Sequence, residues 1–162
     1  MPATPIAATT PYINPGTTKI VWATSVSSKT APTRAEINAG TDLTREIRGS
    51  DGWGVSTNQV DNPDLDTRYT AQIPGRISAD ESSLTFRADV AGADAGALMP
   101  RDTNGFIMIF DGGDVAGRKM RVFPVRVGSV SKPISVDGDD PAECVISYSI
   151  TSEPAENVTV PA

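Results

Sequence analysis

The sequence predicts one mainly β domain, a β-sandwich or partly closed barrel with one short α-helix and extended terminal arms. Three observations lead to this prediction. Fourteen glycines and thirteen prolines are spread along 162 residues and interrupt every segment that is long enough for a sizeable helix. Several segments alternate apolar and polar residues with a period of two, as half-buried strands do. The length suits a single domain with one sizeable core.

The two ends of the chain are predicted to be arms. Residues 1–17 hold four prolines and little apolar content, so we expect an extended arm there, either solvated or docked on a neighbouring copy. Residues 18–152 form the β domain, and residues 153–162 form a second, C-terminal arm. Within the domain, Ile20–Ala23 is expected to be a short early strand.

Two segments have helical signals. Thr33 and Glu36 stand three residues apart, as in a capping box, and Gly40 ends this helix within about two turns. The alanine-rich segment Ala91–Met99 is the second candidate, and Pro100 ends it.

Three segments show the clearest alternation: Arg68–Ile77, Ser83–Val90 and Ala142–Thr151. Their apolar stripes are Tyr69, Ala71, Ile73 and Ile77; Leu84, Phe86, Ala88 and Val90; and Ala142, Cys144, Ile146, Tyr148 and Ile150. The first two segments are separated only by the polar residues 78–82, so they are predicted to pair as a hairpin. Because Cys144 lies in a stripe, we interpret it as a small buried hydrophobic residue.

Two further strands are expected near the centre of the sheet. Phe106–Phe110 is apolar on both faces, which suits a strand that is covered on each side. Met120–Val130 changes apolar phase near Pro124, which cannot donate a hydrogen bond, so a bulge or an edge position is expected there.

The composition excludes many kinds of catalytic and metal site. The chain has no histidine and one cysteine, which removes serine–histidine and cysteine–histidine nucleophile pairs, histidine or cysteine zinc sites and any intrachain disulfide. The glycine-rich segment 112–119 lacks the lysine and hydroxyl positions of a phosphate-binding loop, so a hairpin turn is expected. The acidic runs lack the spacing of a calcium-binding loop. We therefore expect no enzymatic activity, no cofactor and no metal.

The net charge of −6 argues against a basic surface that wraps duplex DNA. Residues 1–10 lack the pattern of a signal peptide, and no segment has the length of a membrane span. Of the two tryptophans, Trp22 lies in an apolar strand and is assigned to the core. Trp53, between two glycines, is assigned to the core or to an interface, with a sugar-stacking role as the alternative.

The order of the segments is more informative than any one of them. The relevant segments are Pro32–Thr44, Gly52-Trp53, the acidic loop that follows, Ser82–Phe86, Gly105–Phe110 and Val122–Gly128. Over residues 20–152, this succession resembles the major tail tube proteins of long, non-contractile-tailed bacteriophages, particularly those of actinobacteria.

The resemblance implies a β-sandwich with one small helix near Ala91–Met99. It also implies rings of six copies whose strands close an inner β-barrel, and stacked rings that form a tube with an acidic lumen through which DNA passes without specific binding. The long loop, at about Gly49–Thr67, and the terminal arms would reach neighbouring copies. The assembly residues in this loop are Trp53, Asp61, Asp64 and Asp66. The candidates for the lumen are Thr70, Gln72, Thr85, Asp89 and Glu143.

The sequence therefore predicts a virion structural protein that conducts DNA into the host. Its partners would be further copies of itself and the tape measure, tail tip and tail terminator proteins, with assembly in the host cytoplasm. A carbohydrate-binding or adhesive β-sandwich is the alternative, supported by Trp53 and the acidic loops. Another virion β-protein, such as a decoration or head–tail joining protein, is also open.

Overall fold

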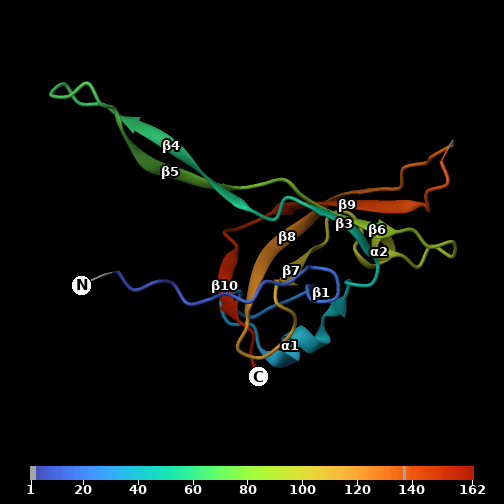
Figure 1. Ribbon diagram of the computed structural model, residues 1–162. Coiled ribbons are helices and arrows are strands. Elements are labelled where there is room, and N and C mark those ends of the chain that lie inside the picture. Colours follow the sequence, from blue (N-terminus) through green and yellow to red (C-terminus); the bar gives the residue numbers. More distant parts are fainter. Residues whose placement is uncertain (1–2, 137) are drawn as a thin grey trace.

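The computed structural model describes residues 3–136 and 138–162, in which a curved β-sheet carries one long projecting hairpin (Figure 1). The elements in chain order are β1 (Lys19–Ala23), α1 (Arg34–Ala39), β2 (Thr41–Asp42), β3 (Ile47–Asp51), β4 (Val55–Asn62), β5 (Ala71–Ala79), β6 (Ser82–Arg87), α2 (Ala95–Leu98), β7 (Asn104–Phe110), β8 (Lys119–Ser131), β9 (Glu143–Ile150) and β10 (Ala155–Thr159). The prediction of a mainly β, sandwich-like fold is confirmed.

The main sheet has eight antiparallel strands in the order β2-β1-β7-β8-β9-β6-β3, with β10 added beside β8. Strands β4 and β5 form a separate two-stranded sheet. Among the described residues, β2 and β3 end the path of the main sheet and do not pair with each other. The single chain is therefore an open sheet and not a partly closed barrel.

Strand β8 organises the core because its two faces contribute to two apolar clusters. Met120 and Val122 belong to one cluster, and Phe123, Val125 and Val127 belong to the other, so the predicted change of phase is confirmed. Along its whole length β8 supports three different neighbours, β7, β9 and β10.

The bulge lies elsewhere than predicted. Pro124 pairs in regular register with Phe106, and its carbonyl oxygen accepts a hydrogen bond from the amide of Thr151 at 3.0 Å. The register between β8 and β9 shifts instead between Val127 and Ser129. Pro124 does not disturb the ladder, because its neighbours use only its carbonyl oxygen, as a hydrogen-bond acceptor, and need no N–H donor from it.

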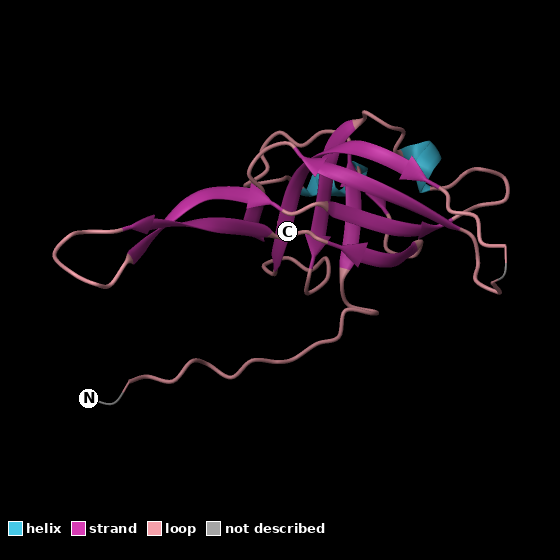
Figure 2. Ribbon diagram, turned by 90° about the horizontal axis from the view of Figure 1, so that it is seen from above, coloured by secondary structure: helices cyan, strands magenta, loops and turns pink. Residues whose placement is uncertain are grey.

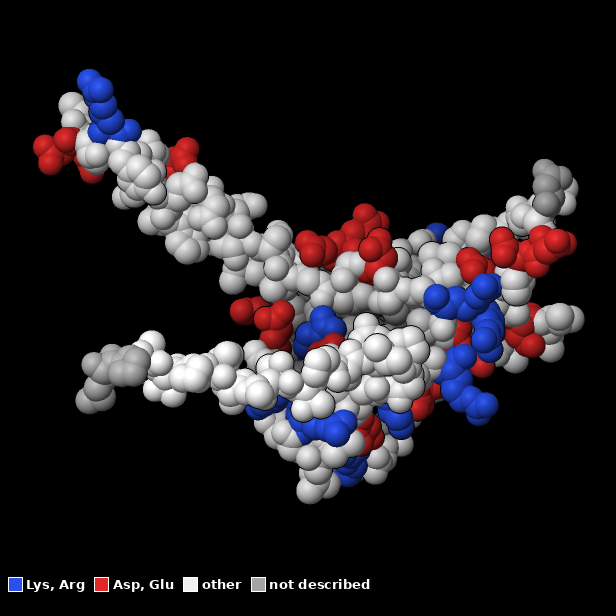
Figure 3. Space-filling model, viewed as in Figure 1, with Lys and Arg blue, Asp and Glu red and all other residues white. Residues whose placement is uncertain are grey.

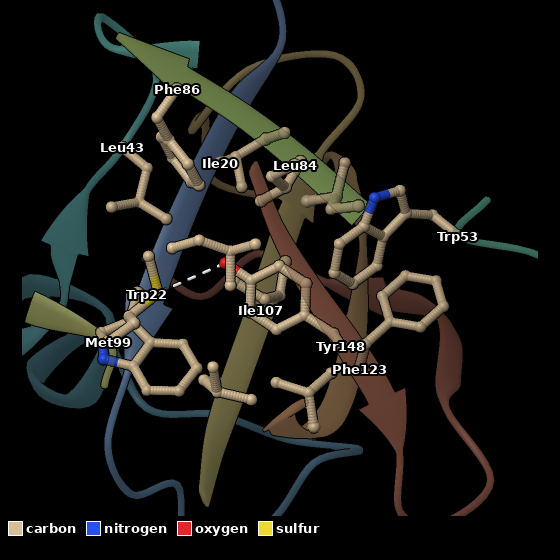
Figure 4. Close-up of a cluster of buried hydrophobic side chains, with 14 of the residues drawn as sticks. Ile20, Trp22, Leu43, Trp53, Leu84, Phe86, Met99, Ile107, Phe123 and Tyr148 are labelled. Atoms are coloured by element: carbon tan, nitrogen blue, oxygen red, sulfur yellow. Dashed lines mark hydrogen bonds between the residues drawn. The ribbon is translucent and has the colours of Figure 1, made fainter. Parts of the chain in front are cut away.

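The larger cluster lies on one face of the sheet and contains both tryptophans (Figure 4). Its buried members come from β1, β6, β7, β8 and β9 and from the segments that follow β2, β3 and α2. Leu84 and Phe86 of β6 and Cys144, Ile146 and Tyr148 of β9 are among them, so these parts of the predicted stripes are confirmed, whereas Val90 and Ala142 lie outside the strands and are exposed. Burial at this scale contributes roughly 1.5–3 kcal/mol for each large side chain.

The smaller cluster covers the opposite face of β1, β7 and β8. Helix α1 contributes Ile37, and the C-terminal segment contributes Ala155, Val158 and Val160. Strand β7 is thus covered on both sides, as its continuous apolar sequence predicts. The C-terminal residues are docked on the body through β10, which differs from the extended arm expected there.

Both helical signals are present, so the described part of the chain has two short helices where one was expected. Thr33 Oγ1 accepts a hydrogen bond from the Glu36 amide at 3.3 Å, and Glu36 Oε2 accepts one from the Thr33 amide at 2.7 Å, which completes the predicted capping box. Helix α2 starts only at Ala95, after the N-cap Asp94. The helix does not begin at Ala91 because Gly92 takes a left-handed φ of 76°.

The predicted hairpin between Arg68–Ile77 and Ser83–Val90 is wrong. β5 pairs with β4, whereas β6 pairs with β3 and β9. The two pairs are consecutive parts of one long ribbon, because Asp51 pairs with Ser83 and Val55 pairs with Ala79 on either side of a short break. The predicted stripe of β5 is exposed in the single chain, and β6 ends at Arg87, which leaves Val90 in solvent.

Candidate assembly surfaces

The long hairpin leaves the body at Gly52-Trp53-Gly54. Gly52 and Trp53 both take left-handed φ values, 77° and 66°, which is uncommon for a tryptophan. The side chain of Trp53 is only 4 % exposed, and its ring packs between Phe123 and Tyr148 (Figure 4). The root of the hairpin is therefore anchored in the core by one of its own residues.

Hydrogen bonds fix the same root from several sides. The amide of Trp53 donates to Ser82 Oγ at 3.1 Å, and its indole Nε1 donates to the carbonyl oxygen of Ser83 at 3.2 Å. The amide of Asp80 donates to the carbonyl oxygen of Gly54 at 3.0 Å, which joins the two strands where they leave the body. Both strands of the hairpin are thus held in place where the hairpin meets the main sheet.

Beyond the root, the hairpin contacts solvent on nearly all sides. Every residue of β4 and β5 is exposed except Val55 and Gly75, which are half-buried. Val60 pairs with Ile73, which is 50 % exposed, and Ile77, paired with Thr57, is 58 % exposed. On the side that Figure 3 shows, the hairpin has few charged side chains between its root and its tip, and Arg76 of β5 is the one charged residue among residues 55–60 and 71–79.

The tip of the hairpin carries the acidic residues. Asp61 Oδ1 accepts a hydrogen bond from Gln72 Nε2 at 2.8 Å, across the two strands. Asp64 Oδ1 accepts bonds from the amides of Asp66 and Thr67, which closes a turn. Leu65, between these aspartates, is fully exposed.

The N-terminal segment projects from the same side of the body as the hairpin (Figures 1 and 2). Residues 3–18 carry no charged side chain. Ile6 is 92 % exposed, and Tyr12 and Ile13 are exposed as well. The arm and the part of the hairpin between its root and its tip thus share two properties, exposure of apolar side chains and few charged residues, with Arg76 of β5 as the exception in the hairpin.

A third surface is the uncovered face of β3, β6 and β9, which carries mostly hydroxyl groups and ion pairs. Thr85 and Ser83 of β6 lie half-buried on this face, in register with Val145 and Ser147 of β9. At its edge, Arg48 Nη1 lies 3.2 Å from Glu143 Oε1.

Basic residues on this third surface and next to it have acidic neighbours. Glu143 pairs in register with Arg87, and Arg126 Nη2, on the adjoining strand β8, lies 3.1 Å from Asp102 Oδ1. The face is therefore polar without an excess of positive charge.

Comparison with known families identifies the molecule. Residues 7–162 match the family model described as phage tail tube protein. The chain belongs to the phage tail tube protein family. No protein with a curated description matches the sequence.

Two solved structures support the same fold for this tail tube protein. One is the SPP1 tail tube, with a TM-score of 0.56 and 15 % identity, covering 89 % of this chain and 78 % of the other. The second is the virion of a native gene transfer agent particle, with a TM-score of 0.51 and 12 % identity, covering 74 % of this chain and 89 % of the other. Family membership makes the chain a structural component of a virion tail.

The structure distributes the predicted residues of the tail tube protein over different surfaces. Trp53 lies in the core, so its side chain is unavailable for stacking on a sugar. Asp61, Asp64, Asp66, Thr70 and Gln72 all belong to the hairpin or its tip.

Only two of the five lumen candidates lie together on the uncovered face, Thr85 on β6 and Glu143 on β9. Asp89 lies in the loop after β6, where its Oδ2 accepts a hydrogen bond from the Ala93 amide at 3.1 Å. The five candidates therefore do not form one surface in the single chain. The predicted loop at Gly49–Thr67 is part of the β3–β6 and β4–β5 ribbon.

Sequence reasoning missed the residues that hold the root of the hairpin. Neither Asp111 nor Arg121 is among the candidate residues that the sequence indicates. Arg121 Nε and Nη2 donate to the two carboxylate oxygens of Asp111 at 2.9 and 2.6 Å. The sequence does hold a sign of the projecting surfaces: residues 3–18 and 55–60 carry no charged side chain.

The described residues contain no cluster of three or more metal-binding side chains. None of the helices in the described part is long and apolar enough to cross a membrane. Segment 112–119 forms the turn between β7 and β8, as predicted. Burial raises the pKa of the Cys144 thiol, which keeps this side chain protonated in the core.

Proposed function

We propose that this tail tube protein assembles into six-membered rings that stack into the tube, through docking of the hairpin and the N-terminal arm on neighbouring copies. The exposure of β4 and β5 carries this proposal. An isolated two-stranded hairpin is marginally stable in water. A hairpin of this length that exposes Ile73 and Ile77 gains stability when another surface covers it.

The low charge of the same segments supports their docking. Cores of protein interfaces are depleted in charged residues; residues 3–18 of the arm carry none, and Arg76 is the one charged residue among residues 55–60 and 71–79 of the hairpin. The open edges of the main sheet offer a further means of association, because unpaired strand edges pair readily with another chain. A head-to-tail contact of this kind closes into a ring when its rotation permits.

We assign the uncovered face with Thr85 and Glu143 to the bore of the tube, as the resemblance implies. Its hydroxyl groups are wettable, and its arginines lie next to carboxylates. A net charge of −6 on every copy repels the phosphates of a passing duplex. The tube would then conduct DNA into the host without binding it.

The remaining partners follow from the same proposal. The ends of the tube would contact tape measure, tail tip and tail terminator proteins, and assembly would take place in the host cytoplasm. The function needs no catalytic residue. The carbohydrate-binding alternative loses its main support, because Trp53 is buried.

Removal of the hairpin tests the proposal. In this variant, an Asn-Gly turn joins Val55 directly to Ala79, which are paired neighbours at the root. We expect a folded monomer with an almost unchanged melting temperature that forms no tubes under conditions in which the full chain does. Tubes formed by the shortened chain would refute the role of the hairpin.

A further inference from the structure

One side chain from outside the hairpin reaches its root. Arg121, on β8, donates from Nη1 to the carbonyl oxygen of Trp53 at 3.0 Å. The backbone of Trp53 is in the left-handed region, with φ 66°. A bulky residue keeps such a conformation only where its surroundings determine it. The contact from Arg121 is one of these determinants.

The guanidinium of Arg121 is itself held in place. Asp111 binds it through both carboxylate oxygens, at 2.6 and 2.9 Å, a paired geometry that restricts rotation. The ring of Phe123 lies under the same group, 5.8 Å from its central carbon. The carbonyl oxygen of Asp111 accepts a hydrogen bond from Thr18 Oγ1 at 3.0 Å, so the root of the N-terminal arm adjoins this network.

The network borders an open groove and not a sealed cavity. The groove has a volume of about 470 Å³ and is lined by the roots of the arm and the hairpin, among them Asn14, Gly52 and Trp53. The side chains of Arg121 and Asp111 are 31 % and 37 % exposed. Shortening Arg121 therefore leaves no enclosed void, and the fold is expected to tolerate it.

We propose that Arg121 is a positioning residue that fixes the angle at which the hairpin leaves the body, by holding the Trp53 carbonyl from a guanidinium that Asp111 immobilises. This inference concerns the same assembly as the proposed function and rests on it for its consequence. The angle itself is a property of the single chain and can be measured without assembly.

The length of the hairpin makes the angle important. The eight residues of β4 extend over roughly 26 Å at about 3.3 Å per residue. A rotation of about 10° at the root therefore moves the far end by almost 5 Å, which exceeds the reach of about 4 Å of a side-chain contact. A hairpin with a loose root samples many positions in which its docking contacts are lost.

The test compares Arg121→Gln with a matched control, Arg34→Gln. Arg34 makes comparable contacts, two bonds from Nη1 to Asp114 and one from Nη2 to the carbonyl oxygen of Pro161, but it lies away from the hairpin. Spin labels on Asn62→Cys and Thr41→Cys report the distance from the hairpin to the body by pulsed electron paramagnetic resonance. The only native cysteine, Cys144, is buried.

We expect Arg121→Gln to widen the distance distribution at least twofold, and Arg34→Gln to leave it unchanged, with similar melting temperatures for both. Arg121→Gln should also raise the concentration needed for tube formation at least about tenfold, as expected when each copy loses a properly placed contact. Asp111→Asn retains the Arg121 side chain but removes the carboxylate that immobilises its guanidinium. This variant should widen the distance distribution to an intermediate degree.

An unchanged distribution in both Arg121→Gln and Asp111→Asn would overturn the inference. If Arg121→Gln fails to fold, the distribution in Asp111→Asn decides alone. A full chain that forms no tubes would count against the proposed function, while the distance measurement would still decide the role of Arg121.

Discussion

The indole ring of Trp53 meets the ring of Phe123 edge-on, with centroids 5.2 Å apart and planes inclined by 75°. Trp53 is the residue at which the projecting hairpin begins, and Phe123 lies on the central strand β8. The projecting hairpin is therefore connected to the core through the aromatic ring of Trp53, in addition to the hydrogen bonds at its root. This explains how a long hairpin can project without separating from the sheet.

Replacement of Trp53 by alanine should lower the free energy of unfolding by about 3–5 kcal/mol, because the buried ring loses its contacts and leaves a cavity. Denaturation in urea measures this change. Tyr69→Ala, at the exposed end of the hairpin, is the control and should change the same free energy by less than about 0.5 kcal/mol. A small effect of Trp53→Ala would show that the hairpin is anchored by its hydrogen bonds alone.

The double replacement Ile73→Ser and Ile77→Ser should raise the concentration needed for tube formation while leaving the melting temperature almost unchanged. Both side chains are about half exposed in the single chain, so the fold loses little, whereas a docked hairpin would lose two apolar contacts. Val90→Ser, at a fully exposed site in the loop after β6, is the control. Sedimentation of assembled material measures the effect, and equal sedimentation of the double variant and the control would exclude this docking face.

Glu143→Gln should give the assembled tube affinity for duplex DNA, because Arg48 loses the carboxylate that lies 3.2 Å away. Asp102→Asn should act in the same way through Arg126. Retention of a short duplex on the tubes measures the binding, which should weaken strongly between about 50 and 200 mM salt. Glu156→Gln, on β10, removes the same charge elsewhere and should have no effect. Equal retention by Glu143→Gln and Glu156→Gln would remove the uncovered face from the bore.

Stability should fall in acid partly through Glu36, whose pKa is lowered from 4.5 to about 2, chiefly by hydrogen bonds from the amides of Thr33 and Ser27. A lowered pKa in the folded state means that the carboxylate stabilises the fold fully above about pH 4.5 and loses this contribution as the pH falls towards 2. Unfolding curves of the chain and of Glu36→Gln, measured between pH 6 and pH 2, should therefore converge at the acid end. Parallel curves over this range would contradict this role of the capping box.

The elements that pack within one chain could be predicted from the sequence, because the residues that form their apolar stripes are the ones that the fold buries. Leu84 and Phe86, and likewise Cys144 and Ile146, alternate with polar neighbours and are buried as the alternation predicts. The cap at Thr33 depends only on residues within one turn, so the local sequence was sufficient.

The hairpin could not be predicted in the same way. The alternation in Arg68–Ile77 is real, but the single chain provides no surface that covers its apolar face, so a core strand was expected where an exposed strand exists. The burial of Trp53 depends on Phe123 and Tyr148, which are 70 or more residues away along the chain, and its glycine neighbours give no sign of them. The position of the bulge, between Val127 and Ser129, is set by the pairing of β8 with β9 and not by Pro124.

The most direct test of ring assembly is a helical reconstruction, by electron cryomicroscopy, of tubes formed by the full chain. We expect six copies in each ring, with Ile73 and Ile77 of the hairpin covered by a neighbouring copy and the face that carries Thr85 and Glu143 turned towards a continuous bore. Tubes in which the hairpins remain in solvent, or a chain that stays monomeric at every concentration tried, would contradict assembly through the hairpin.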